Sequence, residues 1–272
     1  MGPSSSWKRW RCLSALALWL VAAAAFAEAP RIEAIFPSGA LLPANHLKFY
    51  LHFSAPMREG IFLDYCRLLD EHGAPVADPF RETELWSEDH RRLTLWLHPG
   101  RQKTGVNLND DFGPVLQPGH AYTLVIAAGW PSADGVPLGG EVRKAFRTSE
   151  RSTAQLDAGR WQIAAPKAGS LEPVEIHFPA PLDHALLQRC LHVLDETSAS
   201  VEGSVATADD ERTWRFTPAH AWRVAGYQIQ AESILEDLAG NSLARPFEVD
   251  LSAPPPKAVP RVVCLPFQPR AH

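Results

Sequence analysis

A short polar stretch holds the side chains of this sequence that are best suited to bind a charged ligand. Arg101 and Lys103 lie among glycines, and two cations on such a loop are an arrangement that can hold an anion. The spacing is not that of a phosphate-binding P-loop, because Val106 stands where that motif requires lysine. The alternative, which we favour, is a structural flap in which the two cations form surface ion pairs with Asp110 and Asp111.

Trp96 is the second candidate for ligand binding. It alternates with Leu95 and Leu97, so a strand here places its ring on the face opposite the two leucines. An exposed indole can stack on a sugar or on a partner protein, whereas tryptophans of β-sandwiches more often pack in the core or at its rim. Arg101, Lys103 and Trp96 are therefore the residues that we predict for binding.

No arrangement of residues in the sequence indicates catalysis or a bound metal. His-Glu-x-x-His, paired Cys-x-x-Cys and Gly-x-Ser-x-Gly motifs are all absent from it. Asp134, Asp237 and Asn241 have oxygens that suit calcium, but no Asp-x-Asp-x-Asp loop accompanies them, and such residues beside glycine are chiefly turn formers. His52 and His177 occupy the same position in separate copies of a repeat, so we do not expect a shared metal site. We expect no enzyme, no metal and no cofactor.

The elements that must position these residues occur twice in the chain. Residues 46–57 read His-Leu-Lys-Phe-Tyr-Leu-His-Phe-Ser-Ala-Pro-Met, and residues 174–183 repeat the pattern as Val-Glu-Ile-His-Phe-Pro-Ala-Pro-Leu-Asp. Apolar and polar residues alternate in both copies, which is typical of a strand with one buried and one solvated face. Proline then ends the strand, because it has no N–H to donate.

The two copies differ in length at one place. The offset between them is 125 residues from Pro56 to Pro181, and 105 residues from Tyr122 to Tyr227. About 20 residues are therefore extra in the first copy, at about residues 99–117. This insert contains Arg101 and Lys103, and loops added to a rigid scaffold are where binding sites often lie.

The complete pattern predicts an all-β chain of two tandem antiparallel β-sandwiches. The chain has 272 residues and 24 prolines, and its short alternating stretches are separated by Gly/Pro turns. We expect a first sandwich at residues 28–149 and a second at 157–252, whose last strand contains Phe247, Val249 and Leu251. Residues 253–272 are predicted to be a proline-rich tail, extended or disordered.

The first 27 residues predict export. Lys8, Arg9 and Arg11 precede an apolar run, and Ala25-Phe26-Ala27 is a small-x-small cleavage signal. The run is shorter than the roughly 20 residues of a membrane span. We expect residues 1–27 to be a signal peptide cleaved after Ala27, which leaves a periplasmic or secreted protein with no membrane span.

The net charge of the mature chain limits the classes of partner that we expect it to bind. The leader contains three of the 26 basic residues and none of the 31 acidic ones, so the mature net charge is −8. An acidic chain without a basic run is poorly suited to nucleic acid or an anionic membrane. We therefore expect a protein or cell-envelope partner, with a glycan as the alternative.

Three cysteines remain after the leader is removed. Cys66, Cys190 and Cys264 are an odd number, which excludes complete pairing within one chain. Alignment of the two copies places Cys66 on a core face and Cys190 one residue out of step, on the opposite face. A Cys190–Cys264 disulfide stays open as an alternative.

Four short motifs resemble the bacterial Ig-like domain of S-layer proteins, of the SbsA type. They are Phe-Ser-Ala-Pro-Met at 53–57, Leu-Asp-Glu-His-Gly at 69–73, Gly-x-x-Tyr at 119–122 and Asp-Leu-Ala-Gly-Asn at 237–241. The second copy is the closer match, and the first departs from the pattern at the insert. The resemblance implies an exported spacer, adhesion or interaction module, and the family has no catalytic motif to transfer.

We therefore expect an exported, non-enzymatic, Ig-like binding or structural module. One alternative is a carbohydrate-binding or enzyme-accessory protein that uses the insert and an exposed Trp96. Another is a hydrolase with a site between the domains, although no nucleophile–base pair supports it.

Overall fold

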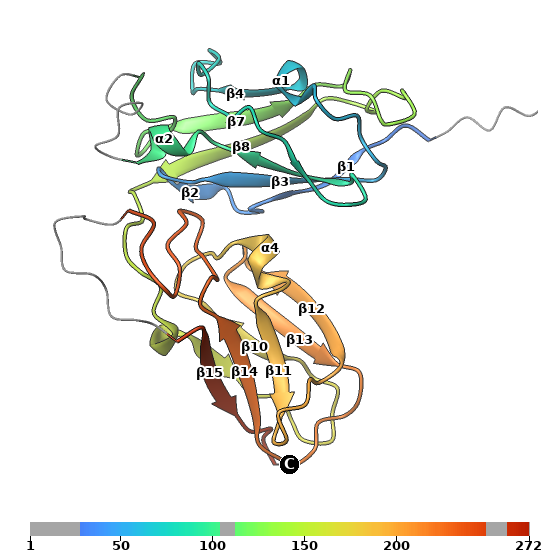
Figure 1. The fold of residues 1–272 in the computed structure, drawn as a ribbon, viewed down its shortest axis with the longest axis vertical. Coiled ribbons are helices and arrows are strands. Elements are labelled where there is room, and N and C mark those ends of the chain that lie inside the picture. The colour runs from blue at the N-terminus through green and yellow to red at the C-terminus, as the bar shows by residue number, and fades with distance from the viewer. Residues whose placement is uncertain (1–27, 104–111, 249–259, 272) are drawn as a thin grey trace, which may run out of the picture.

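The computed structural model describes residues 28–103, 112–248 and 260–271, which form two β-sandwiches placed one below the other in Figure 1. The fold is built almost entirely from antiparallel sheets, so the all-β prediction is confirmed. The predicted signal peptide, residues 1–27, lies outside the described residues.

The first domain contains two four-stranded sheets, ordered β1-β3-β6-β5 and β2-β8-β7-β4. Its strands are β1 (Ile32–Phe36), β2 (Leu41–Pro43), β3 (Lys48–Phe53), β4 (Cys66–Leu69), β5 (Leu85–Trp86), β6 (Arg92–Trp96), β7 (Ala121–Ile126) and β8 (Val142–Ser149). Two helical turns, α1 (Phe62–Tyr65) and α2 (Pro99–Gln102), connect them. All paired strands are antiparallel except β2 and β8, which are parallel.

The second domain contains a four-stranded sheet, β9-β10-β13-β12, and a three-stranded sheet, β11-β14-β15. Its strands are β9 (Gln162–Ala164), β10 (Val174–His177), β11 (Leu191–Asp195), β12 (Gly203–Ala208), β13 (Thr213–Pro218), β14 (Tyr227–Glu232) and β15 (Val262–Phe267). A 3-10 turn, η1 (Ala158–Arg160), precedes β9, and α4 (His184–Leu187) precedes β11.

Strand order matches between the two domains. The order β1-β3-β6-β5 corresponds to β9-β10-β13-β12, and β8-β7-β4 corresponds to β15-β14-β11. The backbone N–H of Arg58 bonds to Pro131 as that of Asp183 bonds to Glu236, which fixes these residues as equivalents. The core faces of β3 and β10 are also as predicted from the alternation. The core-facing residues are Phe49, Leu51 and Phe53 in the first domain and Val174, Ile176 and Phe178 in the second.

The last strand of the second domain differs from the prediction. Phe247 lies in a bend, because its backbone N–H is held by the side chain of Asn241 in the preceding turn. Val249 and Leu251 lie outside the described residues. The strand beside β14 is instead β15, which pairs with it over six residues inside the segment that we predicted to be a tail. Phe267 anchors β15 by stacking on Tyr227, with ring centroids 5.5 Å apart.

The insert begins as a helical turn and ends in the first core. Its first residues form α2, and its last part returns Val115 and Leu116 to the core, where each is at most 2% exposed. Residues 104–111 lie outside the described residues.

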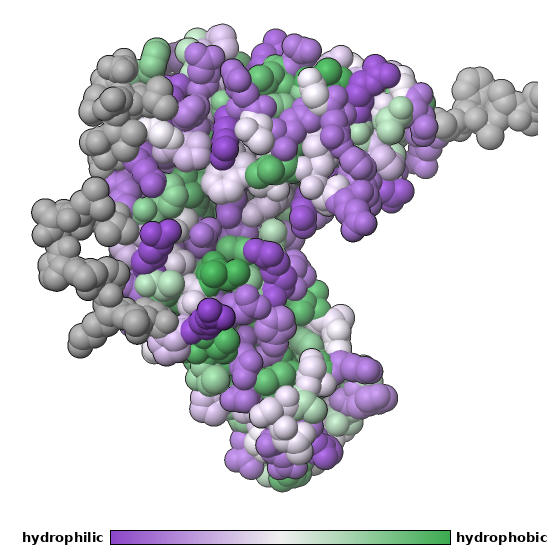
Figure 2. Space-filling model, in the orientation of Figure 1, coloured by the Kyte–Doolittle hydropathy of each residue, from purple (hydrophilic) through white to green (hydrophobic). Residues whose placement is uncertain are grey.

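The outer face of β3 contacts the second domain, although its polar side chains predicted a solvated face. Lys48 is 8% and Tyr50 is 6% exposed, because α4 and the turn after β14 cover them. In Figure 1, α4 lies at the end of the second domain that faces β3. Figure 2 shows the two domains in contact on one side and separated by a notch on the other, and hydrophilic residues cover most of the face drawn.

Candidate functional site

A buried ionic cluster joins the two domains. Asp183 is 2% exposed and precedes α4, where one carboxylate oxygen accepts the N–H of Leu186 as a helix cap. The Lys48 Nζ lies 2.9 Å from Asp183 Oδ2, and the Tyr50 hydroxyl donates to the same carboxylate at 2.8 Å. Glu236 Oε2 lies 3.3 Å from Lys48 Nζ. One carboxylate of the second domain thus binds two side chains of β3.

The electrostatics of this cluster favour charged Lys48 and neutral Tyr50 at neutral pH. Burial opposes the charge of Lys48, but the Asp183 and Glu236 carboxylates outweigh it and raise the pKa of the amine. Burial and Asp183 raise the pKa of the Tyr50 phenol. Lysine therefore stays a cation and tyrosine a neutral donor, which suits hydrogen bonds to a carboxylate rather than proton abstraction.

The linker between the domains is tied to both of them. Asn45 of the first domain exchanges two hydrogen bonds with the backbone of Ser152, at 2.7 and 2.9 Å. The Ser152 hydroxyl donates to Asp237 Oδ2 at 2.8 Å. Asp237 Oδ1 accepts the backbone N–H groups of Ala239 and Asn241, so this carboxylate has the turn-forming role that we favoured over calcium binding. Among the described residues, no group of three or more His, Cys, Asp or Glu is placed to hold a metal ion.

The side chain of Leu238 forms an apolar plug that completes the interface. Leu238, although it follows β14 of the second domain, belongs to the buried core of the first and is 5% exposed. Its carbonyl oxygen accepts the N–H of Leu47 at 3.1 Å. Gly240 has a φ of +82°, and a Cβ there would lie 2.6 Å from a methyl carbon of Leu47. This turn therefore requires glycine both for its conformation and for its close approach to the first domain.

A further set of contacts links β1 and the loop after it to the second domain. The backbone N–H of Ser38 donates across the interface to Glu211 Oε2 at 2.9 Å. Lys144 of β8 holds the same loop within the first domain by donating to the carbonyl of Ser38 at 3.0 Å. Phe36 stacks on the ring of His184 with a centroid distance of 3.4 Å. Polar and aromatic contacts therefore surround the ionic cluster.

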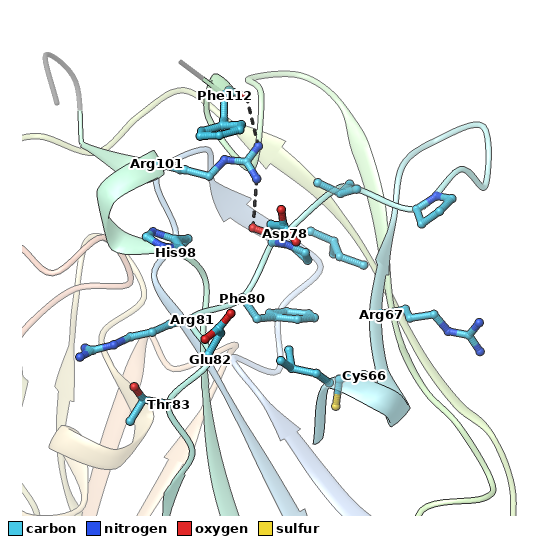
Figure 3. A pocket seen from close by; sticks show the side chains of 15 residues that line it. Cys66, Arg67, Asp78, Phe80, Arg81, Glu82, Thr83, His98, Arg101 and Phe112 are labelled. Atoms are coloured by element: carbon cyan, nitrogen blue, oxygen red, sulfur yellow. Dashed lines mark hydrogen bonds between the residues drawn. The ribbon is translucent and has the colours of Figure 1, made fainter. Parts of the chain in front are cut away.

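Arg101 lines a hollow of the first domain with a volume of about 640 Å³ (Figure 3). Its side chain is 8% exposed and its guanidinium is used within the domain. It donates to the carbonyl oxygens of Ala77, Asp78, Phe112, Gly113 and Pro114. In Figure 3, Arg67 and Arg81 extend to opposite sides, so cations do not converge on the hollow. The predicted partners Asp110 and Asp111 lie outside the described residues.

The other two predicted binding residues lie apart from Arg101. The Lys103 Nζ sits 4.5 Å from the ring centroid of Phe247. Trp96 is half-buried at the interface, and the Lys48 Nζ lies 5.1 Å from its ring centroid. The structure therefore does not gather the three side chains into one site.

Sequence reasoning missed the interface residues Lys48, Tyr50 and Asp183. The available signal was a difference between the two copies on the outer strand face. Where the first copy has Lys48 and Tyr50, the second has Pro173 and Glu175. A polar face that changes chemically between equivalent strands indicates different surroundings.

Cys66, Cys190 and Cys264 are all free thiols in the structure. Cys66 is buried as predicted, and burial raises the pKa of its thiol. The prediction for Cys190 is wrong: it is 1% exposed, because it precedes β11 in a turn where its N–H bonds to Leu186. Burial raises the pKa of Cys190 to about 11, whereas Cys264 is exposed on β15.

Comparison with known proteins was made by sequence and by structure. No family model and no curated protein matches the sequence. Among solved structures, domains 1–6 of the surface layer protein SbsC align with a TM-score of 0.31 and 11% identity over 75% of this chain and 23% of that one. The MG0-NIE-MG1 part of Escherichia coli alpha-2-macroglobulin aligns with a TM-score of 0.30 and 8% identity over 88% of this chain and 71% of that one.

At TM-scores of this size the likeness carries no argument, and this chain spans about a quarter of the SbsC structure. The class of protein follows instead from the strands and cores described above. It is an all-β protein of two antiparallel β-sandwiches joined by a buried polar interface. No helix among the described residues is long and apolar enough to cross a membrane.

Proposed function

We propose that the protein is an exported, non-enzymatic module of the SbsA-type Ig-like class that holds two β-sandwiches at a fixed angle. Its partner is a protein or another component of the cell envelope. The observation that carries the proposal is the interface around Asp183, which is built to fix one domain on the other.

The fixed angle between the two domains is supported by the contacts that would be lost if the interface opened. Interfaces between domains of one chain are by default polar and mobile. Here Lys48 and Asp183 would separate, and Leu238 would leave the core of the other domain. Exposure of a leucine costs about 1.5–3 kcal/mol. The charge pair regains water on opening, so its directional hydrogen bonds fix the angle between the domains more than they add to the free energy of closure. A spacer or presenting module requires this coupling.

The non-enzymatic part of the proposal is supported by the state of the polar groups. Tyr50 and Lys48 are buried, and each is bonded to Asp183. The Arg101 guanidinium bonds to backbone carbonyls. Export is supported by the leader-like residues 1–27 of the sequence.

Small-angle X-ray scattering of residues 28–272 at neutral pH tests the fixed geometry. We expect one rigid arrangement to account for the scattering of the native chain. Lys48→Ala combined with Asp183→Ala should broaden it to an ensemble, because the central bonds are removed. The matched control is Glu175→Ala with Arg215→Ala, an ion pair at the equivalent strand position of the second domain that is not part of the interface. Native scattering that requires an ensemble would contradict the proposal.

Export and the lack of activity have their own tests. The intact mass of the protein recovered from the periplasm or medium should equal that of a chain that begins at Glu28. Retention of residues 1–27 would refute cleavage. Turnover of generic esters, glycosides or phosphates that disappears with Tyr50→Phe would instead favour a hydrolase with its site between the domains.

A further inference from the structure

The interface contains an imidazole that is placed for its neutral form. His184, the first residue of α4, lies face to face with Phe36 of β1, with ring centroids 3.4 Å apart and planes 8° apart. Its Nδ1 lies 3.3 Å from the hydroxyl of Thr207 on β12. The ring is thus held between the two domains by a stack and one neutral hydrogen bond.

The charges around His184 disfavour an added proton. His52 of β3 lies with its ring centroid 6.0 Å away, and Arg92 of β6 is a nearby cation. Asp183 is the neighbouring carboxylate, but it is bonded to Lys48 and Tyr50. A protonated His184 would therefore meet one histidine and one arginine, with the neighbouring Asp183 carboxylate already shared. The face of Phe36 would attract the charge, but it replaces only part of the lost solvation.

A second imidazole at the interface has the same preference. His46 is completely buried, and its ring nitrogens lie near the backbone of Leu238 and Lys48 without a well-formed hydrogen bond. It precedes Leu47, which bonds to Leu238 of the other domain, and the nearby charged groups are Lys48 and Lys144. Protonation of His46 would place a third cation there.

We propose that the interface is a pH-sensitive latch, closed while His184 is neutral and loosened when His184 takes up a proton. The proposal rests on the fixed coupling of the two domains proposed above and adds its regulation. The ligand of the latch is the proton, and acidification is the signal that would free the two sandwiches from their fixed angle.

The direction of the pH dependence follows from proton linkage. Burial lowers the pKa of His184 to about 4, and His52 adds to the effect, whereas the ring has an ordinary pKa near 6.5 once the domains separate. Closure therefore loses stability as the pH falls from 6.5 towards 4, by about 30-fold in the closing equilibrium at pH 5. His46, whose pKa burial lowers to about 3, acts in the same direction.

Three carboxylates oppose the effect of the histidines on the closing equilibrium. Burial raises the pKa of Glu211, Glu236 and Asp237, so each favours closure as the pH falls. They titrate in the native chain and in a His184→Phe variant alike, so a comparison of the two chains isolates the contribution of His184.

Hydrogen exchange of the Leu47 amide measures the latch, because that N–H donates across the interface to Leu238. In residues 28–272 its protection factor should fall between pH 7.5 and 5.0, with about 30-fold of the change due to His184, while that of Leu51 in the first core stays constant. His184→Phe keeps the stack on Phe36 without a titrating group, and it should reduce the fall at least tenfold. His177→Phe, an exposed histidine of the second domain, should leave the fall unchanged.

The outcomes separate the latch from the proposed function. If the Leu47 amide is unprotected at both pH values, the fixed coupling itself is wrong. If it is protected equally at both, the coupling stands and the latch is overturned. If His184→Phe shows the same fall as the native chain, His184 is not the switching group and the proposal fails. A protection factor of Leu51 that falls in parallel would indicate acid unfolding of the domain and would equally overturn the latch.

Discussion

At the scale of single residues, Arg101 is a structural tie between loops. Its guanidinium joins the segment at Ala77 and Asp78 to the segment at Gly113, and the side chain is almost completely buried. Removal of this charged donor breaks several partly buried hydrogen bonds at once, and hydrogen bonds to charged groups are worth about 1.5–3 kcal/mol each. We expect Arg101→Ala to lower the free energy of unfolding of the first domain by about 2–4 kcal/mol, measured by urea denaturation.

Arg67 gives the matched control for this prediction. It lines the same hollow but is exposed on β4, so Arg67→Ala should change the free energy of unfolding by less than about 0.5 kcal/mol. A stable Arg101→Ala variant that fails to bind an envelope partner would instead restore the anion-binding interpretation of the insert.

The three thiols should differ sharply in reactivity. Burial raises the pKa of Cys66 and of Cys190, the latter to about 11, so both stay protonated and inaccessible at pH 8. Cys264 is exposed. Titration of native residues 28–272 with a thiol reagent should therefore detect one fast-reacting thiol, and three after denaturation. Fewer than three in denaturant would show that a disulfide, such as Cys190–Cys264, forms.

At the scale of elements, β15 is required for the second sandwich. It supplies one edge of the three-stranded sheet, and Phe267 lies against Tyr227 and Trp222. Truncation after residue 260 should remove the cooperative unfolding of the second domain, because β14 keeps β11 but loses its other partner strand and the core is opened. Near-UV circular dichroism would report the loss through Trp222. Deletion of residues 271–272 alone should be neutral, and a stable domain after truncation at 260 would contradict the assignment.

Sequence patterns predicted the features of a strand that depend on its own residues. They missed the features that depend on contacts with other parts of the chain. The alternation in β3 and β10 identified their core faces, because period two is a property of the strand itself. The last strand was misplaced, because residues 247–251 alternate whereas residues 262–267 are a continuous apolar run. The hydrogen bond from Phe247 to Asn241 and the stack of Phe267 decide between them, and both contacts join residues that the alternation does not relate.

At the scale of the whole molecule, the same pattern concealed the site. A polar strand face is typical of solvent exposure, but Lys48 and Tyr50 face Asp183 of another domain. Periodicity reports which residues share a face and not what covers it. The candidate binding residues were chosen by chemical type, and the fold places Arg101 and Trp96 in separate structural roles.

Leu238 makes the strongest test of how the two domains depend on each other. It belongs in sequence to the second domain and in space to the core of the first, so Leu238→Ala creates a cavity across the interface. We expect a loss of about 2–4 kcal/mol, and we expect it to appear in the first domain and in the protection of the Leu47 amide rather than in β14. Hydrogen exchange resolved by strand would measure it. Ile234→Ala, in the same loop but 50% exposed, is the control and should have little effect. Loss of protection confined to the second domain would show that the two sandwiches are stable independently and that the plug does not couple them.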